Sequence, residues 1–331
     1  MAEKVIPLVS IIIPVYNGKN YLAEAIDSAL AQTYGKIEVI VINDGSTDNS
    51  HEIAISYGDR IRYYQKENGG VSTALNLGLS VMHGEYFSWL SHDDLYHPNK
   101  IYNQIIALEN NCNGIAYSDY DVIDKDGMHL VTMNIAKIYP KTDLTIGLFP
   151  ILRQVLNGCT LLIHVSHFSR VGKFDESLRA VQDYDMWFRM LRGVKLTYVN
   201  AVLVSQRQHG AQVTHRYEAA RIEANRFWLK MVQDISEDEA CQVDGSELSF
   251  WDNQVEFLRY TNYRDARLYA KACLKSLGGG QVTLPRLLKR ATYSILTMVA
   301  RFVRLIRVQK LTNESRLINL GYRLWFGVRY K

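Results

Sequence analysis

Two adjacent carboxylates, Asp93 and Asp94, follow a short run of aromatic and apolar residues at 86–90. The run predicts a buried strand, and the acidic pair stands where that strand should end. In open α/β sheets ligands bind beyond the carboxyl ends of the strands, where carboxylate oxygens suit a hard divalent cation and that cation suits a diphosphate. The alternative is a helix cap or a turn, and the pair alone does not decide between the two.

The composition is that of an ordinary globular protein. The chain has 331 residues, of which 47% are hydrophobic and 22% are charged, so it can bury a large core in one main domain with an appendage. Its four cysteines are widely spaced and include no C-x-x-C pair. This spacing favours reduced thiols in a cytosolic protein over a disulfide framework or a zinc site.

Positive charge is concentrated towards the C-terminal end. The net charge is +4, but residues 281–331 contain eleven Lys and Arg and a single acid, which leaves residues 1–280 with a net charge of −6. In residues 284–306 apolar side chains recur every three or four positions, with cations on the opposite side. Such a basic amphipathic helix suits the interface of an anionic membrane. The alternative is packing on the main domain or on a second subunit; no nucleic-acid motif accompanies the charge.

Neither a signal peptide nor a transmembrane helix is expected. The apolar run at residues 5–15 contains Pro7 and Pro14, is too short to span a bilayer and is not followed by a small-residue cleavage site. No stretch of about 20 uncharged apolar residues occurs in the sequence. We therefore expect a cytoplasmic protein that is peripheral on the cytosolic face of the membrane.

Strands and helices alternate along the first 215 residues. β-Branched or apolar runs at 9–15, 38–42, 61–64 and 87–90 predict strands, and helical spacing lies between them. This rhythm predicts an α/β fold with a doubly wound, mostly parallel sheet, right-handed crossovers and helices on both faces. Beyond about residue 214 only helical periodicity remains.

Two local features refine this outline. Asn17 is placed to cap the first helix, because a side-chain oxygen at that position can accept from the helix amides. Asp126-Gly127 predicts a hairpin turn, because both residues tolerate positive φ.

Four segments occur in a fixed order: V-S-I-I-I-P-V-Y-N-G from residue 9, I-N-D-G-S-T-D-N-S from 42, N-G-G-V-S-T-A-L-N-L-G from 68 and W-L-S-H-D-D-L-Y from 89. They are followed by V-G-K-F-D-E and Q-D-Y-D-M-W. Together these motifs resemble glycosyltransferase family 2, the nucleotide-sugar enzymes of the GT-A fold. The resemblance covers roughly residues 8–215.

The resemblance implies a nucleotide pocket at the turns that follow the strands. The ring of Tyr16 would lie along the base, and Asp44 would accept a hydrogen bond from the imide N–H of uracil or thymine. The alternatives are a core tyrosine, a helix cap and, at 68–70, a structural turn. The residues implied in donor binding are Pro14, Tyr16, Asn17, Asp44, Gly45, Asn68, Gly70, Ser91 and Asp93.

The resemblance also implies a metal site. Asp93 matches the last Asp of the family's D-x-D signature, whereas Ser91 replaces the first Asp; a serine can still bond a ribose hydroxyl but adds no charge. Mn²⁺ or Mg²⁺ bound by Asp93, Asp94 and His209 would bridge the diphosphate oxygens. For His209 the alternative is an ordinary structural histidine.

Asp183 matches the catalytic base of the family. It would take the proton from an acceptor hydroxyl as the oxygen attacks the anomeric carbon from the far side, which inverts the configuration. Asp185 is the nearby rival, although two residues along a helix it should point elsewhere. Trp187 either joins a sugar-stacking wall or packs in the core. Met186 stands where processive synthases have Arg before Trp, which favours a single or limited transfer.

The sequence thus predicts three regions: a GT-A nucleotide-sugar-binding and catalytic domain at 1–215, a helical extension at 216–280 and a basic membrane-associating tail at 281–331. The expected function is transfer of a hexose-type sugar from a UDP- or dTDP-sugar to a hydroxyl of a lipid-linked glycan in cell-surface polysaccharide synthesis. The alternatives are a sugar-nucleotide-binding protein without activity and a transferase to polyprenyl phosphate. The sugar, the linkage and any oligomer stay open.

Overall fold

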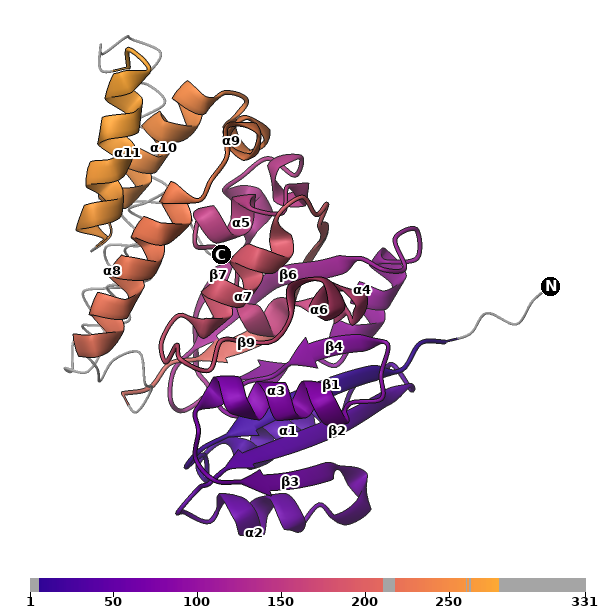
Figure 1. The fold of residues 1–331 in the computed structure, drawn as a ribbon. Helices are drawn as coiled ribbons and strands as arrows, with labels where there is room; N and C mark the ends of the chain where they lie inside the picture. Colours follow the sequence, from indigo (N-terminus) through magenta and orange to yellow (C-terminus); the bar gives the residue numbers. More distant parts are fainter. Residues whose placement is uncertain (1–5, 211–217, 260, 262, 280–331) are drawn as a thin grey trace, which may run out of the picture. The chain divides into compact units, whose positions relative to one another are not determined.

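The structure is a computed structural model that describes residues 6–210, 218–259, 261 and 263–279 (Figure 1). The described residues all belong to one compact unit, Met1–Gly280. The predicted basic tail at 281–331 lies outside the described residues, so its membrane association stays a prediction. Within the described part of the chain no helix combines the length and apolar character needed to cross a bilayer.

The N-terminal half of the first unit is a parallel sheet, as predicted. Strand β1 is fully buried and pairs in parallel with β2 on one side and β4 on the other, while β3 extends the sheet beyond β2. The β-branched side chains of β1 suit a strand that is covered on both faces. The bounds are β1 Val9–Val15, β2 Ile37–Asp44, β3 Arg62–Lys66 and β4 Tyr86–Trp89.

Helices cover both faces of this parallel part. The chain moves outward from β1 to β3 and then returns to β4, so right-handed crossovers place the helices before and after the reversal on opposite faces. Helix α1 buries its apolar stripe, and α3 packs on β1 and β2 (Figure 1). The bounds are α1 Leu22–Leu30, α2 Ser50–Ile55, the 3₁₀ turn η1 Gly58–Arg60 and α3 Val71–Val81.

The second half of the sheet contains antiparallel as well as parallel pairs. The strand order is β3-β2-β1-β4-β8-β6-β9-β5, with β7 paired to β6. Only β6 and β9 pair in parallel there, whereas β8, β7 and β5 are antiparallel to their neighbours. The β6–β7 hairpin turns at Gly127, with φ 82°, as predicted. The bounds are β5 Leu95–Tyr96, β6 Ile115–Ile123, β7 His129–Met133, β8 Leu162–His164 and β9 Thr197–Arg207.

Short helical segments connect these strands, and α7 is the longest of them. Helix α7 buries Met186, Trp187 and Phe188 and leaves Asp183 partly exposed at its first turn. The bounds are α4 Lys100–Ala107, η2 Ile135–Lys137, η3 Asp143–Thr145, α5 Phe149–Leu152, η4 Gly158–Thr160, α6 Ser166–Val171 and α7 Gln182–Leu191.

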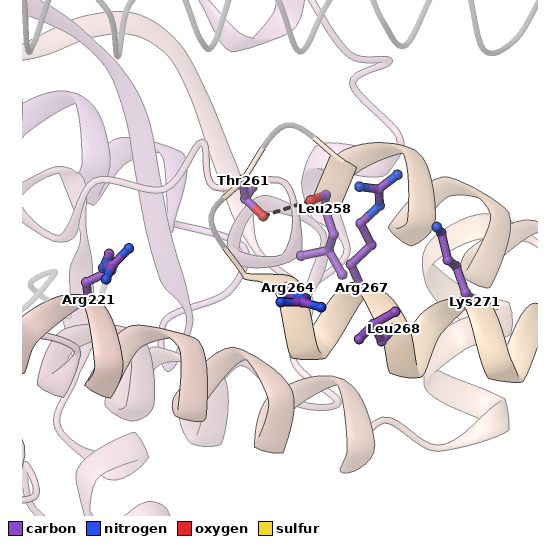
Figure 2. Close-up of a pocket in the computed structure, with 7 residues that line it drawn as sticks. All are labelled: Arg221, Leu258, Thr261, Arg264, Arg267, Leu268 and Lys271. Atoms are coloured by element: carbon purple, nitrogen blue, oxygen red, sulfur yellow. Dashed lines mark hydrogen bonds between the residues drawn. The ribbon is translucent and has the colours of Figure 1, made fainter.

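Described elements after β9 are all helical, and they pack on one another: α10 contacts α9 and α11, and α11 contacts α8. A cleft of about 370 Å³ lies among α8, α10 and α11 (Figure 2). The predicted boundaries at 215 and 280 themselves stay a prediction. The bounds are α8 Glu218–Gln233, α9 Glu237–Asp244, α10 Glu247–Arg259 and α11 Arg264–Ser276.

Two arginines fasten these helices to the sheet region. The buried side chain of Arg153 donates to both carboxylate oxygens of Asp244 at 2.8 and 2.6 Å. Arg192, which follows α7, forms ion pairs with Asp234 and Glu239, the latter at 2.6 Å. Glu239 is also part of a capping box with Ser236 at the start of α9. The helical extension is therefore held by charge-assisted hydrogen bonds as well as by apolar packing.

Lys100 lies completely buried beneath the loop that carries the acidic pair. Its ammonium group donates to Ser88 Oγ and Gln104 Oε1, both at 2.8 Å, and to the Leu161 carbonyl at 3.3 Å, and it lies over the ring of Tyr96 at 4.3 Å. Burial lowers the pKa of Lys100 from 10.5 to about 7, because the surroundings cannot solvate the charge as water does. Lys100 thus links α4 to Ser88 of β4 and to Leu161, the residue after η4. Keeping its ammonium group charged in this buried position lowers the free energy of unfolding by an amount that depends on pH.

We predict that this destabilisation disappears as the pH rises. Between about pH 7 and 10 the native state releases the Lys100 proton while the unfolded chain keeps it, so the free energy of unfolding should rise with pH in that window and be flat below it. Urea unfolding of the wild type and of Lys100→Met across these pH values measures the effect as a difference between the two proteins. The exposed substitution Lys173→Met is the control, and parallel profiles for wild type and Lys100→Met would contradict the assignment.

Candidate active site

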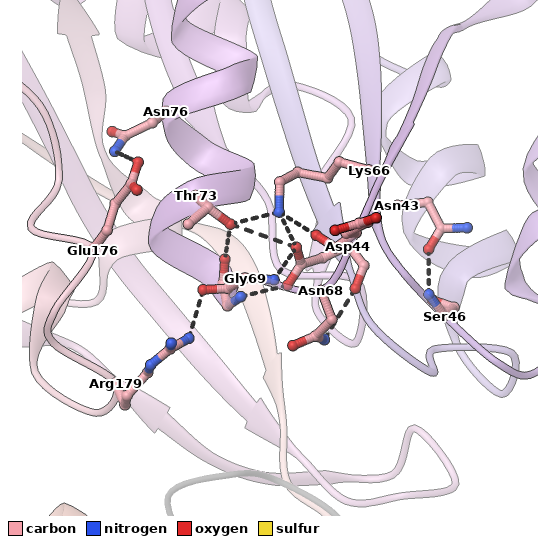
Figure 3. Close-up of polar contacts among 12 residues, drawn as sticks. Asn43, Asp44, Ser46, Lys66, Asn68, Gly69, Thr73, Asn76, Glu176 and Arg179 are labelled. Atoms are coloured by element: carbon pink, nitrogen blue, oxygen red, sulfur yellow. Dashed lines mark hydrogen bonds and ion pairs between the residues drawn. The ribbon is translucent and has the colours of Figure 1, made fainter.

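The carboxylate of Asp44, at the end of β2, is buried and organises the turn before α3 (Figure 3). Its Oδ1 accepts from Lys66 Nζ at 2.6 Å and from the Gly69 amide at 3.0 Å, while Oδ2 accepts from the Gly70 amide at 2.7 Å. Asn68 donates to the Asp44 carbonyl at 3.0 Å. A buried charge must be paired and hydrogen-bonded, and here one cation and two amides meet that need. Lys66 was not foreseen from the sequence.

Glycines make this turn geometrically feasible. Gly70 has φ 92°, which disfavours residues with a Cβ, and a Cβ there would also clash with the guanidinium of Arg179. Gly45 has φ 74°, and a Cβ there would lie 2.6 Å from the Asn68 amide nitrogen. The backbones of the two turns can therefore approach each other.

The turn at Gly69 is linked to the start of α7. Arg179 Nη1 donates to the Gly69 carbonyl at 2.5 Å (Figure 3). The carboxylate of Glu223, on α8, accepts from the amides of Arg179, Ala180 and Val181, with the shortest distance 2.7 Å. Three amides on one carboxylate fix the path of the loop that leads into α7. Nothing in the local sequence around Glu223 signals this contact, because its partners lie 42 to 44 residues earlier.

Asp183 occupies the first turn of α7, as predicted. Burial raises the pKa of its carboxyl from 3.8 to about 6, although the Tyr184 and Asp183 amides oppose the shift; the Tyr184 amide lies 2.8 Å from Oδ1. A carboxylate with this pKa is ionised at neutral pH and is a far better proton acceptor than an ordinary aspartate. Asp185 instead forms an ion pair with Arg189 at 2.8 Å along the helix, and its structural role stays a prediction.

The acidic pair splits into one carboxylate that faces His209 and one that turns inward. Asp93 Oδ2 lies 3.0 Å from His209 Nε2. Asp94 Oδ1 accepts from the Arg207 amide at 2.8 Å, and its side chain is buried. Burial, together with the charge of Asp93, raises the pKa of Asp94. The two neighbours therefore differ in surroundings, although their sequence positions do not distinguish them.

Arg207 at the end of β9 holds the acidic loop in place. It is buried, donates from Nε to the Asp93 carbonyl at 3.0 Å and from Nη2 to Glu24 at 2.6 Å, and lies over the ring of Tyr21 at 4.5 Å. Because His209 follows two residues later, these contacts set where its ring lies against Asp93. In the segment Q-R-Q-H-G at 206–210, His209 was predicted as a site residue and Arg207 was not.

The loop after β1 meets the loop after β2. Asn17, with φ 52°, accepts at its side-chain oxygen from the Thr47 amide at 2.8 Å, and its own amide donates to Ser46 Oγ at 3.0 Å. The prediction that Asn17 caps the first helix is wrong, because α1 begins only at Leu22 and this side chain bonds across to the neighbouring loop. Tyr16 is half-exposed, so its ring is accessible, whereas Pro14 is buried within β1.

A second line of contacts connects the acidic loop with α7. Ser91 lies 3.4 Å from the Cys159 thiol through both its amide and its hydroxyl. At the neighbouring Gly158 a Cβ would lie 3.2 Å from the indole nitrogen of Trp187, which is buried and has no hydrogen-bond partner. Trp187 is thus a packing residue of the core, the more common of the two alternatives weighed above. η4 therefore lies against Ser91, in the loop that carries the acidic pair, through Cys159, and against Trp187 of α7 through Gly158.

The donor atoms at Asp93 and His209 fit a divalent cation. Among the described residues no group of three or more His, Cys, Asp or Glu side chains is arranged to hold a metal. A pair is nevertheless sufficient for Mg²⁺ or Mn²⁺ beside a diphosphate, because these ions commonly take one or two protein ligands and complete their shell with phosphate oxygens and water. Asp94, the third predicted metal ligand, is buried and accepts a hydrogen bond from the Arg207 amide, so its part in a metal site stays a prediction.

We predict that Glu223→Gln loosens the loop that enters α7. A neutral amide oxygen accepts more weakly than a carboxylate, so the free energy of unfolding should fall by about 1–2 kcal/mol. The amides of Arg179, Ala180 and Val181 should exchange hydrogen faster, because their common acceptor is weakened. Exchange measured by mass spectrometry tests this, with the exposed Glu237→Gln on α9 as control. Unchanged protection at the three amides would show that Glu223 does not anchor the loop.

Comparison with known proteins identifies the family. Residues 10–172 match the sequence profile of Glycosyl transferase family 2. An uncharacterised glycosyltransferase of Rickettsia typhi is 45% identical over 292 residues, which cover 87% of this chain and 91% of the relative. A longer rickettsial glycosyltransferase is 46% identical over 82% of this chain, and the chain spans only 40% of its length.

Solved structures with little sequence identity share the fold. Staphylococcus aureus TarS in complex with UDP-GlcNAc gives a TM-score of 0.57 at 14% identity, covering 89% of this chain and 91% of that one. The mannosyltransferase PcManGT of Pyrobaculum calidifontis, in complex with GDP-Man and Mn²⁺, gives 0.57 at 16% identity, covering 93% and 88%. These likenesses confirm the predicted GT-A-type α/β fold. With the family profile and the Rickettsia typhi relative, they lead to one conclusion: the chain belongs to glycosyltransferase family 2.

Proposed function

We propose that this glycosyltransferase moves a sugar from a UDP- or dTDP-linked donor to a hydroxyl of a glycan acceptor with inversion, and that Asp183 is the base. The observation that carries the proposal is the carboxyl of Asp183, whose pKa is raised to about 6 at the first turn of α7. Its loop is fixed by Glu223, and Arg179 in that loop contacts the turn organised by Asp44. Direct displacement requires a base near the bound donor, and the Arg179 contact links the loop before Asp183 to the turn proposed to bind the nucleotide.

The reaction would proceed in one displacement. The acceptor oxygen attacks the anomeric carbon, its proton passes to Asp183, and the bond from that carbon to the diphosphate oxygen breaks with its electron pair on the leaving nucleoside diphosphate. The attacking and leaving oxygens lie on opposite sides of the carbon, so the configuration inverts. A general base in this position typically contributes a factor of about 10²–10⁴ in rate.

Recognition of the base would involve Asp44. Its Oδ2 has the Gly70 amide as its hydrogen-bond partner, and an ionised oxygen can accept a second hydrogen bond, such as that from the imide N–H of uracil or thymine. The half-exposed ring of Tyr16 is available to lie along the base. TarS was solved with UDP-GlcNAc and PcManGT with GDP-Man, so relatives of this fold bind more than one nucleotide. We favour a pyrimidine because Asp44 matches the family carboxylate that accepts the imide N–H of uracil or thymine.

A divalent cation, Mn²⁺ or Mg²⁺, would be held by Asp93 and His209. When bound, it would neutralise charge on the departing diphosphate. Arg207 would keep the two ligands in position through the Asp93 carbonyl and the end of β9. Ser91 would bond a ribose hydroxyl, and Asp94 would support the loop from behind through the Arg207 amide.

The acceptor is proposed to be a lipid-linked glycan used in cell-surface polysaccharide synthesis, reached at the cytosolic face of the membrane. The eleven cations of residues 281–331 support this, because a basic amphipathic segment is attracted to anionic lipid. Vesicle co-sedimentation of the whole chain, before and after removal of residues 281–331, addresses this proposal.

We predict that Asp183→Asn lowers kcat by about 10²–10⁴ in an assay of nucleoside diphosphate release from a panel of sugar nucleotides with Mn²⁺. In the wild type kcat should rise about tenfold per pH unit below pH 6 and level off above it, because the base must be ionised. Asp185→Asn, the same change two residues further along α7, is the matched control and should stay within a few-fold of wild type. Equal turnover by Asp183→Asn would remove Asp183 from the role of base.

We predict that His209→Ala weakens Mn²⁺ binding by about tenfold or more, because it removes one of two protein ligands. Electron paramagnetic resonance of free Mn²⁺ during titration measures this with UDP present and does not depend on turnover. His83→Ala is the control, since that ring is largely exposed and its neighbours are Arg62 and Glu38. The same Mn²⁺ affinity in wild type and His209→Ala would exclude His209 as a ligand.

A further inference from the structure

The cleft among α8, α10 and α11 is lined mainly by cations. Its volume of about 370 Å³ is that of a small-molecule site. Arg264, Arg267 and Lys271 stand on one face of α11, at positions i, i+3 and i+7, and Figure 2 shows them beside one another. Arg221 on α8 adds a fourth basic side chain. The remaining lining residues are Leu258, Thr261 and Leu268, so the lining contains no carboxylate.

The three cations of α11 are not neutralised within the described residues. Arg264, Arg267 and Lys271 have no ion-pair partner there, and Arg267 Nε is buried without a hydrogen-bond partner. The single carboxylate of α11, Asp265, instead accepts from Asn225 of α8 at 2.7 Å. Arg259 at the end of α10 shows the usual arrangement, because it pairs with Glu256 at 2.8 Å.

Such an arrangement is unfavourable without a counter-ion. Like charges three or four residues apart on a helix repel each other, and a buried donor without an acceptor costs free energy. An oxyanion in the cleft would relieve both effects. Guanidinium groups present paired N–H donors that match the oxygens of phosphate, and Lys271 adds a mobile point charge.

We propose that this cleft is a binding site for a phosphate-bearing ligand, separate from the catalytic residues. The volume accommodates a diphosphate or a sugar phosphate, and several cations favour a multiply charged anion over a single carboxylate. The phosphate can come from a soluble compound or from a phospholipid headgroup, which offer the same chemistry. The site does not depend on the proposed donor, metal or base, so it can be tested by binding alone.

The test is calorimetric titration of the full-length protein with inorganic diphosphate, in the presence of EDTA so that metal-dependent binding elsewhere is suppressed. The double variant Arg264→Gln/Lys271→Gln removes two exposed cations from the cleft and should retain the fold, which circular dichroism verifies. We expect it to bind diphosphate at least about tenfold more weakly than the wild type. Arg267→Lys keeps the charge, loses the paired donors and should fall between the two.

The matched control is Lys275→Gln, one turn beyond Lys271 on the same helix and outside the cleft, which should bind like the wild type. A second arm measures whether phosphatidylcholine vesicles, with and without phosphatidylglycerol, displace diphosphate from the wild type, a readout that vesicle binding by residues 281–331 does not supply. Displacement by the anionic vesicles alone identifies a headgroup as the source, and retained diphosphate identifies a soluble phosphate. The proposal is overturned if the double variant binds diphosphate as tightly as the Lys275→Gln control.

Discussion

The buried carboxylate of Asp44 is the interaction on which the arrangement of the site depends. Removing a charge from water is costly unless partners replace the solvent, and Lys66 with the Gly69 and Gly70 amides provides that replacement. The same contacts fix the turn that receives Arg179, so the end of β2, the end of β3, the start of α3 and the approach to α7 form one unit. A glycine with φ 92° at Gly70 makes this unit possible.

Arg207 has a comparable role at the loop that carries Asp93 and Asp94. Its buried guanidinium bonds the Asp93 carbonyl and Glu24, and its amide bonds Asp94. These contacts join β9, which pairs in parallel with β6, to the loop that follows β4 in the parallel part of the sheet. Asp183 is positioned differently, by Glu223 from a helix beyond the sheet region. The site therefore takes its order from elements distributed over the described part of the chain, and the helical extension participates in it.

Much of the fold could be predicted because the relevant signals are local. The β-branched run at Val9–Val15 became β1 with the same bounds, and the glycine at 127 turned the expected hairpin. The antiparallel strands β5 and β8 could not be predicted in the same way. Their direction depends on which distant strand each one meets, and β5, only two residues long, exists because Leu95 and Tyr96 pair with Ser205 and Val204.

The sequence by itself determined which side chains stand at strand ends and helix starts, among them Asp44, Asp93 and Asp183, because motif spacing and periodicity are properties of neighbouring residues. Only the tertiary structure decided what those side chains face. It paired Asp93 with His209, turned Asp94 towards the Arg207 amide, and brought Glu223 to the loop before Asp183. The physical reason is that hydrogen-bond partners and desolvation are set by groups far away in the chain, and desolvation of this kind raises the pKa of Asp183.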